Sequence, residues 1–197
     1  INSWYSDVFN MIEYRLPSVD NGNEFVSISG CIYSVNPLKL CGIAKGLSAL
    51  TIASGAVEVC DYSADCEDGH GNISELNIPE SVTTIGQDAF HRCSLTDFAV
   101  NHDINIGNEA FANNNISSVV INSNVNIGQN AFDTNNIHNI VINGVATIGR
   151  SAFDNNREVE SITIKGNTTL DSFAFRYLQT LKELNIIVDE GIVPRFN

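Results

Sequence analysis

The sequence predicts a mainly β solenoid, in which short coils of nearly equal length stack so that their strands run parallel from one coil to the next. Two observations predict this fold class. A phrase of the form Ile-Gly-x-x-Ala-Phe recurs at a nearly constant spacing, and an alternating apolar and polar segment precedes each copy. A repeat of about 20 residues cannot bury its apolar side alone, so the coils must bury one another.

The recurring phrase is expected to form a corner of each coil. It begins at Ile85, Ile106, Ile127 and Ile148, at one constant interval, and a degenerate copy begins a single position late at Leu170. Glycine is the second residue in four of the five copies and indicates a corner, where it supplies a positive φ or room for a close backbone approach. The phenylalanines should turn inward and stack as one core column: Phe90, Phe111, Phe132, Phe153 and Phe175.

A second column is expected three positions after each phenylalanine. It consists of Cys93, Asn114, Asn135 and Asn156, with Leu178 in the fifth copy. Backbone N–H and C=O groups at a corner face inward without strand partners, and a buried asparagine amide can satisfy them. Cys93 fits the same small slot as a reduced core thiol.

The alternating segments predict one parallel sheet to which each coil contributes a strand. They cover residues 73–78, 95–100, 116–121, 137–142, 159–164 and 181–186, with a less regular copy at 47–52. A second short strand is expected before each corner. Its outward side chains should form a column: Thr84, Asn105, Asn126, Thr147 and Thr169.

The segments outside the repeat divide the chain into three parts. Residues 1–46 lack the repeat and are interpreted as an N-terminal cap, because an uncapped terminal coil would expose its apolar face and its strand edge. In this cap, the turn residues 20–23 lie between Arg15-Leu16 and the alternating run 25–28, which suggests a hairpin. Residues 47–187 form the solenoid, and residues 188–197 form a short C-terminal tail.

The five cysteines divide most simply into two local pairs. Cys31 and Cys41 would clip the cap, Cys60 and Cys66 would close an acidic loop, and Cys93 would remain. Oxidised pairs would indicate an extracellular or periplasmic protein, whereas the alternative of five reduced thiols would fit a cytosolic one.

At this point the residues resemble a known family. The phrase Ile-Gly-x-x-Ala-Phe-x-x-Cys/Asn, joined to Leu-Asn-Ile-Pro-Glu-Ser-Val-Thr-Thr-Ile-Gly at residues 76–86, is similar to the BspA-like leucine-rich repeat, over about residues 73–187. The resemblance implies a curved leucine-rich-repeat solenoid. It also implies a non-enzymatic role on a bacterial or protist surface, because members with assigned roles are mostly described as adhesins or host-matrix binders. The chain departs from the family in using asparagine where cysteine is common.

Composition and motifs exclude several function classes. With 23 acidic and 10 basic residues, the chain has a net charge of −13 and repels nucleic acid and anionic lipid. No apolar run is long enough to span a membrane. No GxSxG, HExxH or P-loop motif occurs, and the four histidines fall at positions without a recurrent carboxylate partner, so no catalytic residue is predicted.

No metal site or cofactor is predicted either. Asp61, Ser63 and Asp65 alternate like the start of a calcium loop, but Cys66 stands where an EF-hand requires glycine. We interpret this stretch as a solvated insertion.

The outward positions of the predicted strands form the candidate binding face. Ala99, Val120 and Val141 would make a small exposed apolar strip, and such patches often mark interaction sites. The alternative is that β-branched residues simply suit an exposed sheet. The predicted binding residues are Asp97, Ala99, Ser118, Val120, Asn139, Val141, Ser161 and Thr163.

The sequence therefore predicts a secreted or cell-surface, adhesin-like solenoid. It would bind a host matrix or surface protein through the concave strand face, in an oligomeric state that the sequence leaves open. Two alternatives remain: a structural spacer without a ligand of its own, and a glycan- or ice-binding surface on the column that begins at Thr84.

Overall fold

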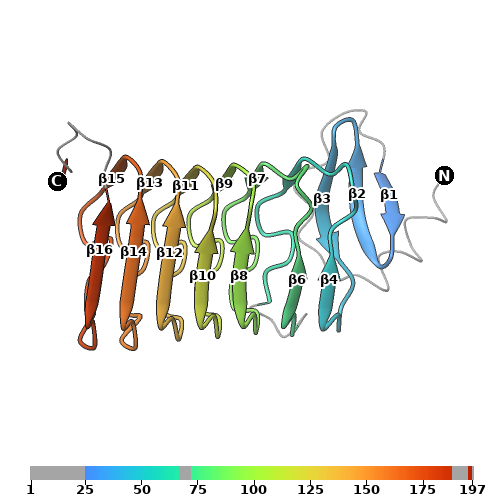
Figure 1. The fold of residues 1–197 in the computed structure, drawn as a ribbon. Helices are drawn as coiled ribbons and strands as arrows, with labels where there is room; N and C mark the ends of the chain where they lie inside the picture. The colour runs from blue at the N-terminus through green and yellow to red at the C-terminus, as the bar shows by residue number, and fades with distance from the viewer. Residues whose placement is uncertain (1–24, 67–71, 188–194, 197) are drawn as a thin grey trace.

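The computed structural model describes residues 25–66, 72–187 and 195–196, and its chain forms a β-solenoid of about seven turns. Figure 1 shows the coils in a row, from the N-terminal end to the C-terminal end. Among the described residues the elements are all strands, and they form three sheets. The predicted fold class is confirmed.

The largest sheet contains the short strands before the corners and runs the length of the molecule. Its order is β1-β2-β3-β5-β7-β9-β11-β13-β15-β17, and it is parallel from β3 onward. The strands are β1 (Phe25–Ile28), β2 (Cys31–Val35), β3 (Leu38–Ile43), β5 (Glu58–Val59), β7 (Thr84–Ile85), β9 (Ile104–Ile106), β11 (Val125–Ile127), β13 (Ala146–Ile148), β15 (Thr168–Leu170) and β17 (Arg195–Phe196).

The alternating segments form two sheets rather than the single one predicted. Five strands pair in the order β16-β14-β12-β10-β8, and β4 pairs separately with β6. The ladder breaks between β6 and β8, where a turn begins at Pro79, whose carbonyl accepts from Val82 N at 3.0 Å. The strands are β4 (Ala49–Thr51), β6 (Glu75–Asn77), β8 (Asp97–Val100), β10 (Ser118–Ile121), β12 (Asn139–Asn143), β14 (Ser161–Lys165) and β16 (Glu183–Ile187).

The N-terminal end of the described chain differs from the repeats because its strands are antiparallel. β1 pairs with β2 and β2 with β3, and β3 then pairs parallel with β5 of the first coil. The run 25–28 is a strand, as predicted, whereas Arg15, Leu16 and the turn 20–23 lie outside the described residues. The division of the chain at residues 46 and 187 stays a prediction.

The predicted phenylalanine column is fully buried at its first four rings, and the fifth, Phe175, is half-buried against the core. Successive rings from Phe90 to Phe175 stack nearly parallel, with centroids 5.2–5.4 Å apart, one coil step for each ring. Phe98 of β8 packs at an angle against the rings of Phe111 and Phe132. Through Phe98, the column packs the sheet that contains β8 against the corners of the coils.

The asparagine column satisfies the corner backbone, as predicted. Asn135 Nδ2 donates to Phe111 O at 3.0 Å and to Phe132 O at 3.2 Å, while its Oδ1 accepts from Ile116 N at 3.0 Å. Asn114 and Asn156 repeat this pattern one coil on each side. Cys93 occupies the equivalent slot of the preceding coil as a buried free thiol.

Candidate functional site

The outer face of the five-stranded sheet carries all the predicted binding residues. Along β8 and β10 exposed or half-buried residues alternate with fully buried ones, and the same alternation continues on β12 and β14. Strand register then aligns the outward side chains in two columns. One column is Asp97, Ser118, Asn139 and Ser161, and the other is Ala99, Val120, Val141 and Thr163.

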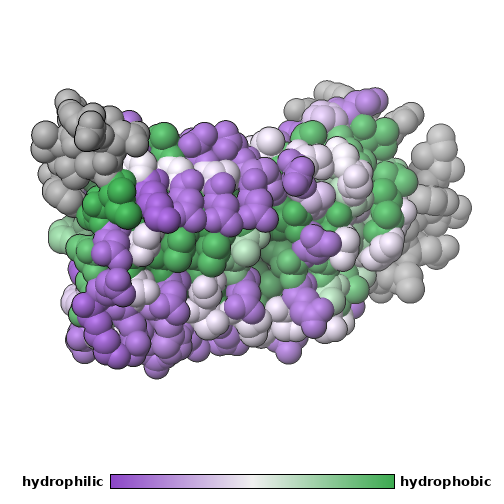
Figure 2. Space-filling model, viewed as in Figure 1, coloured by the Kyte–Doolittle hydropathy of each residue, from purple (hydrophilic) through white to green (hydrophobic). Residues whose placement is uncertain are grey.

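The second column makes an apolar strip along this face. In Figure 2, a green band crosses the strands of the five-stranded sheet, with purple side chains above and below it. Ala99, Val120 and Val141 are the apolar residues that register places side by side there. The first column borders the strip with polar groups, and Ser161 Oγ donates to Asn139 Oδ1 at 2.7 Å. The face combines an apolar centre with a polar margin, as protein interfaces do.

The other margin of the strip is an asparagine ladder that the sequence analysis overlooked. Asn122 Nδ2 donates to Asn101 Oδ1 at 2.7 Å, and Asn143 Nδ2 donates to Asn122 Oδ1 at 2.7 Å. These residues point outward at the ends of β8, β10 and β12. Their constant spacing, equal to the period of the recurring phrase, is the signal that could have revealed them. The ladder fixes the orientation of three amides that would otherwise move freely in solvent.

Comparison with known families matches residues 64–185 to the BspA type leucine rich repeat region, in six copies. The match covers more than half of the chain.

The chain belongs to the BspA-type leucine-rich-repeat family.

This is a non-enzymatic repeat family whose proteins are typically at the cell surface or secreted, and leucine-rich repeats of this kind suggest protein binding. No curated protein and no solved structure matches the chain. In the part of the leucine-rich-repeat chain that the structure describes, no helix has the length and apolarity needed to cross a membrane.

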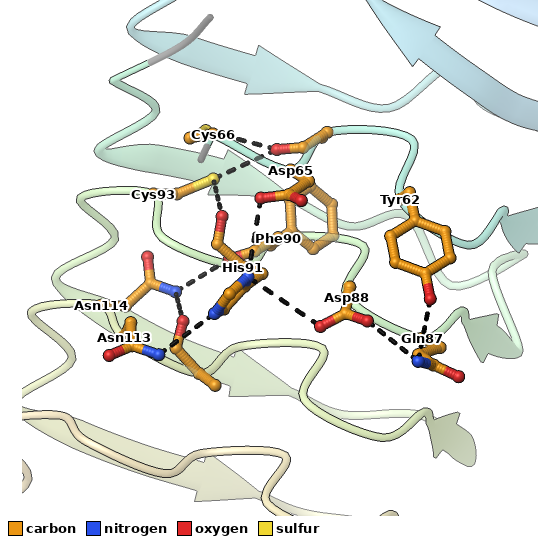
Figure 3. A network of polar contacts seen from close by, with 12 residues as sticks. Tyr62, Asp65, Cys66, Gln87, Asp88, Phe90, His91, Cys93, Asn113 and Asn114 are labelled. Atoms are coloured by element: carbon orange, nitrogen blue, oxygen red, sulfur yellow. Dashed lines mark hydrogen bonds and ion pairs between the residues drawn. The ribbon is translucent and has the colours of Figure 1, made fainter. Parts of the chain in front are cut away.

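A second polar cluster lies on the corner of the leucine-rich-repeat coils, around His91 (Figure 3). His91 Nδ1 lies 3.7 Å from Asp65 Oδ1 and 3.9 Å from Asp88 Oδ1, and its Nε2 lies 3.1 Å from Asn113 Nδ2. His91 and Asp88 are buried. Asp88 lies in the same coil as His91, whereas stacking brings Asp65 of the preceding coil beside it, a contact that the sequence pattern does not indicate.

Stacking also gives His138 a carboxylate neighbour, on another part of the solenoid surface. Its Nε2 lies 3.2 Å from Glu158 Oε2, in an exposed ion pair. Nearby, the Lys182 ammonium lies 2.7 Å from Glu160 and keeps the pKa of that carboxyl below its ordinary value. Both pairs join adjacent coils at the surface, where an ion pair adds little to stability.

Three side chains of the corner cluster could ligate one cation. The ligand atoms of Asp88, His91 and Glu109 all lie within 4.8 Å of one another. Asp61, Ser63 and Asp65, which alternate like the start of a calcium loop, do not converge on this point together. Asp61 Oδ1 instead accepts from Gln87 N at 2.7 Å, and Ser63 is buried. Asp65 alone faces His91, so the loop residues serve the stacking of the leucine-rich-repeat corners.

The cysteines do not pair as predicted. All five are free thiols, so neither Cys31–Cys41 nor Cys60–Cys66 is bonded. Cys41 Sγ instead lies 3.5 Å from Cys60 Sγ on the next coil. Cys93 Sγ donates to Ala64 O at 3.3 Å, and so does Cys66 Sγ. Local pairing along the chain is wrong here because a solenoid brings together residues about one coil apart.

Proposed function

We propose that this chain is a non-enzymatic, adhesin-like protein-binding solenoid, secreted or held at a cell surface. The partner is a matrix or surface protein of a host. The observation that carries the proposal is the aligned apolar strip of Ala99, Val120 and Val141 on the outer face of the five-stranded sheet. Membership of the BspA-type leucine-rich-repeat family supports both the protein-binding role and the location.

The physical basis of binding is a rigid, weakly charged surface. Backbone ladders hold β8, β10, β12 and β14 in register, so the outward side chains lose little conformational freedom when a partner arrives. The strip supplies apolar area to bury, and the asparagine ladder supplies amides at its margin. Between Arg92 and Arg150 the chain has no lysine or arginine, so ionic repulsion of a partner over this stretch comes from a few carboxylates only.

The decisive experiment places positive charge in the strip. The double variant Val120→Arg, Val141→Arg should reduce binding at least tenfold in a surface-plasmon-resonance screen against purified extracellular-matrix proteins. Both positions are only half-buried, so the variant should keep the far-UV circular dichroism and melting temperature of the parent.

A matched control puts the same charges on the opposite wall. Asn126 and Thr147 are exposed on neighbouring strands of the ten-stranded sheet, so Asn126→Arg, Thr147→Arg should bind as the parent does. Unchanged binding by the strip variant, or an equal loss in both variants, would reject the strip as the binding face. A parent that binds none of the screened proteins would favour the spacer alternative.

A glycan- or ice-binding surface is the second candidate. It rests on the column Thr84, Asn105, Asn126, Thr147 and Thr169, which register aligns from β7 to β15, with all but half-buried Thr84 exposed. Within it, Asn126 Nδ2 donates to Asn105 Oδ1 at 2.7 Å, so part of the column's hydrogen-bonding capacity is already used. Thermal hysteresis or saturable binding on a glycan array, lost in Asn126→Arg, Thr147→Arg, would favour this candidate.

A further inference from the structure

We propose that Cys41 and Cys60 are a redox site that closes into a disulfide between two coils. Their sulfur atoms lie 3.5 Å apart, although the two cysteines are 19 positions apart in the chain. This pairing differs from the two local pairs that the sequence suggested. It joins the antiparallel N-terminal strands to the first coil of the solenoid.

Strand register places the two cysteines directly opposite each other. Lys39 pairs with Glu58 and Leu40 with Val59, so Cys41 and Cys60 are the next pair along β3 and its neighbour. The hydrogen bond from Cys60 N to Leu40 O, at 2.8 Å, keeps the strands together at this point. Adjacent strands lie about 4.8 Å apart, within the Cα separation of about 4.4–6.8 Å that disulfides require. Side-chain rotation is therefore enough to form the bond.

Solvent reaches this pair through one of its two sulfur atoms, that of Cys60. Cys60 is partly exposed, whereas Cys41, like Cys31, Cys66 and Cys93, is at most 5% exposed. The hydrogen bond between the two thiols lowers the pKa of Cys41 to about 6 and raises the pKa of Cys60. Thiolate is thus available near neutral pH beside a sulfur that solvent can reach.

The chemistry is thiol–disulfide exchange with a small disulfide such as glutathione disulfide. A thiolate of the pair attacks one sulfur of the oxidant, which forms a mixed disulfide and releases one glutathione thiolate. The second cysteine, as its thiolate, then attacks the protein sulfur and releases the second glutathione. Overall, two protein thiols become one disulfide, and one glutathione disulfide becomes two glutathione thiols.

The bond would close a loop that contains β4, the first strand on the opposite wall. Joining Cys41 to Cys60 would hold β3, β4 and β5 together even when their hydrogen bonds open. Among the described residues β4 pairs with β6 only, so a covalent link between β3 and the end of β5 would help to hold this coil in place.

Peptide mapping tests the connectivity. The purified full chain is equilibrated in glutathione redox buffers, alkylated under denaturing conditions, and digested with trypsin and an Asp-specific protease. These enzymes separate the cysteines by cutting at Lys39, Lys45, Asp61, Asp65 and Arg92. The expected product is a Cys41–Cys60 cross-linked peptide. It should dominate in native buffer and give way to a mixture of linkages when oxidation is carried out in concentrated urea, where the chain is unfolded.

Thermal unfolding supplies the second readout. Oxidation should raise the melting temperature by about 5–10 °C, as for a loop of this length in a chain of this size. Cys41→Ser and Cys60→Ser should abolish the shift, whereas Cys31→Ser, the control, should retain it.

The proposal is overturned if native oxidation leaves Cys41 and Cys60 alkylated, or links either of them to a different cysteine. If a serine variant fails to fold, the peptide map of the parent chain still decides the question. Neither readout involves a binding partner, so the outcome is separate from that of the strip experiment.

Discussion

At the scale of single residues, one small buried position in each coil determines how the inward-facing backbone groups of the corner are hydrogen-bonded. Asn135 bonds two carbonyl oxygens and one amide nitrogen that have no strand partner there. Cys93 occupies this position in an earlier coil and donates weakly to Ala64 O at 3.3 Å and to His91 O at 3.8 Å. The position therefore favours a small side chain that donates a hydrogen bond. An asparagine amide, which donates and also accepts, bonds more of the backbone groups than a cysteine thiol does.

Replacement of Asn135 should separate size from hydrogen bonding. Asn135→Leu keeps a side chain of similar length but leaves buried backbone groups unsatisfied, and it should lower the free energy of unfolding by about 3 kcal/mol. Asn135→Cys retains a weak donor and should cost less than Asn135→Leu. Denaturant titration followed by circular dichroism measures both, and an equal loss in the two variants would contradict the hydrogen-bonding role.

At the scale of the element, each glycine corner is set by close packing rather than by backbone handedness. None of Gly86, Gly107, Gly128 and Gly149 has a positive φ. A Cβ on Gly107 would lie 2.6 Å from the carbonyl carbon of Gly86, in the corner of the preceding coil. Of the two reasons that the sequence offered for glycine, only the close backbone approach holds. The positive φ belongs instead to non-glycine residues nearby, Asp88, Glu109, Asn130 and Ser151.

The corner makes a direct prediction for Gly107. Gly107→Ala must separate two stacked backbones, and we expect it to lower the free energy of unfolding by about 1–3 kcal/mol. Asn105→Ala, on an exposed side chain of the adjacent strand, is the control and should change stability by less than about 0.5 kcal/mol. Thermal or chemical unfolding compares them. A neutral Gly107→Ala would show that the coils can move apart at their corners.

At the scale of the whole molecule, one coil is the unit of construction. The strands of the regular repeat pair with strands of the coils before and after them, and the rings in the core stack with the same step. Contacts are therefore almost all between adjacent coils, as in other solenoids. The stack should tolerate the loss of a whole coil far better than the loss of part of one.

Deletion of residues 107–127 tests this. It removes one full period and joins Ile106 to Gly128, so that the next corner takes the place of the deleted one. We expect a folded protein with the β-rich circular dichroism of the parent and a cooperative melt at a lower temperature.

The control deletion removes residues 112–121, which contain β10 and half a coil. The remaining half coil cannot close, so this variant should lose the cooperative melt or aggregate. Equal behaviour of the two deletions in the melting experiment would contradict the coil as the unit of construction.

Much of the regular part could be predicted from the sequence because its period is constant. Since the regular coils have the same length, the inward phenylalanines, the buried asparagines and the outward strip all follow from alternation and spacing. Asn101, Asn122 and Asn143 are spaced by the same period, so their ladder can be predicted from the sequence in the same way.

The first coils were harder to predict because their lengths vary. Lys39 pairs with Glu58 and Glu58 pairs with Thr84, and the second of these steps along the chain is clearly longer than the first. Without the true offsets, the neighbours of Cys41, Cys60 and His91 cannot be assigned, and pairing of cysteines that are close in the sequence is the simplest prediction.

The sequence by itself determined that the chain is a solenoid and which side chains face in or out, because a constant period repeats the same environment in every coil. Only the tertiary structure decided which residues of neighbouring coils touch: Cys41 with Cys60, and His91 with Asp65. Such contacts depend on the offset between two particular coils. Where insertions change the coil length, that offset is fixed by packing and backbone hydrogen bonds rather than by any local pattern.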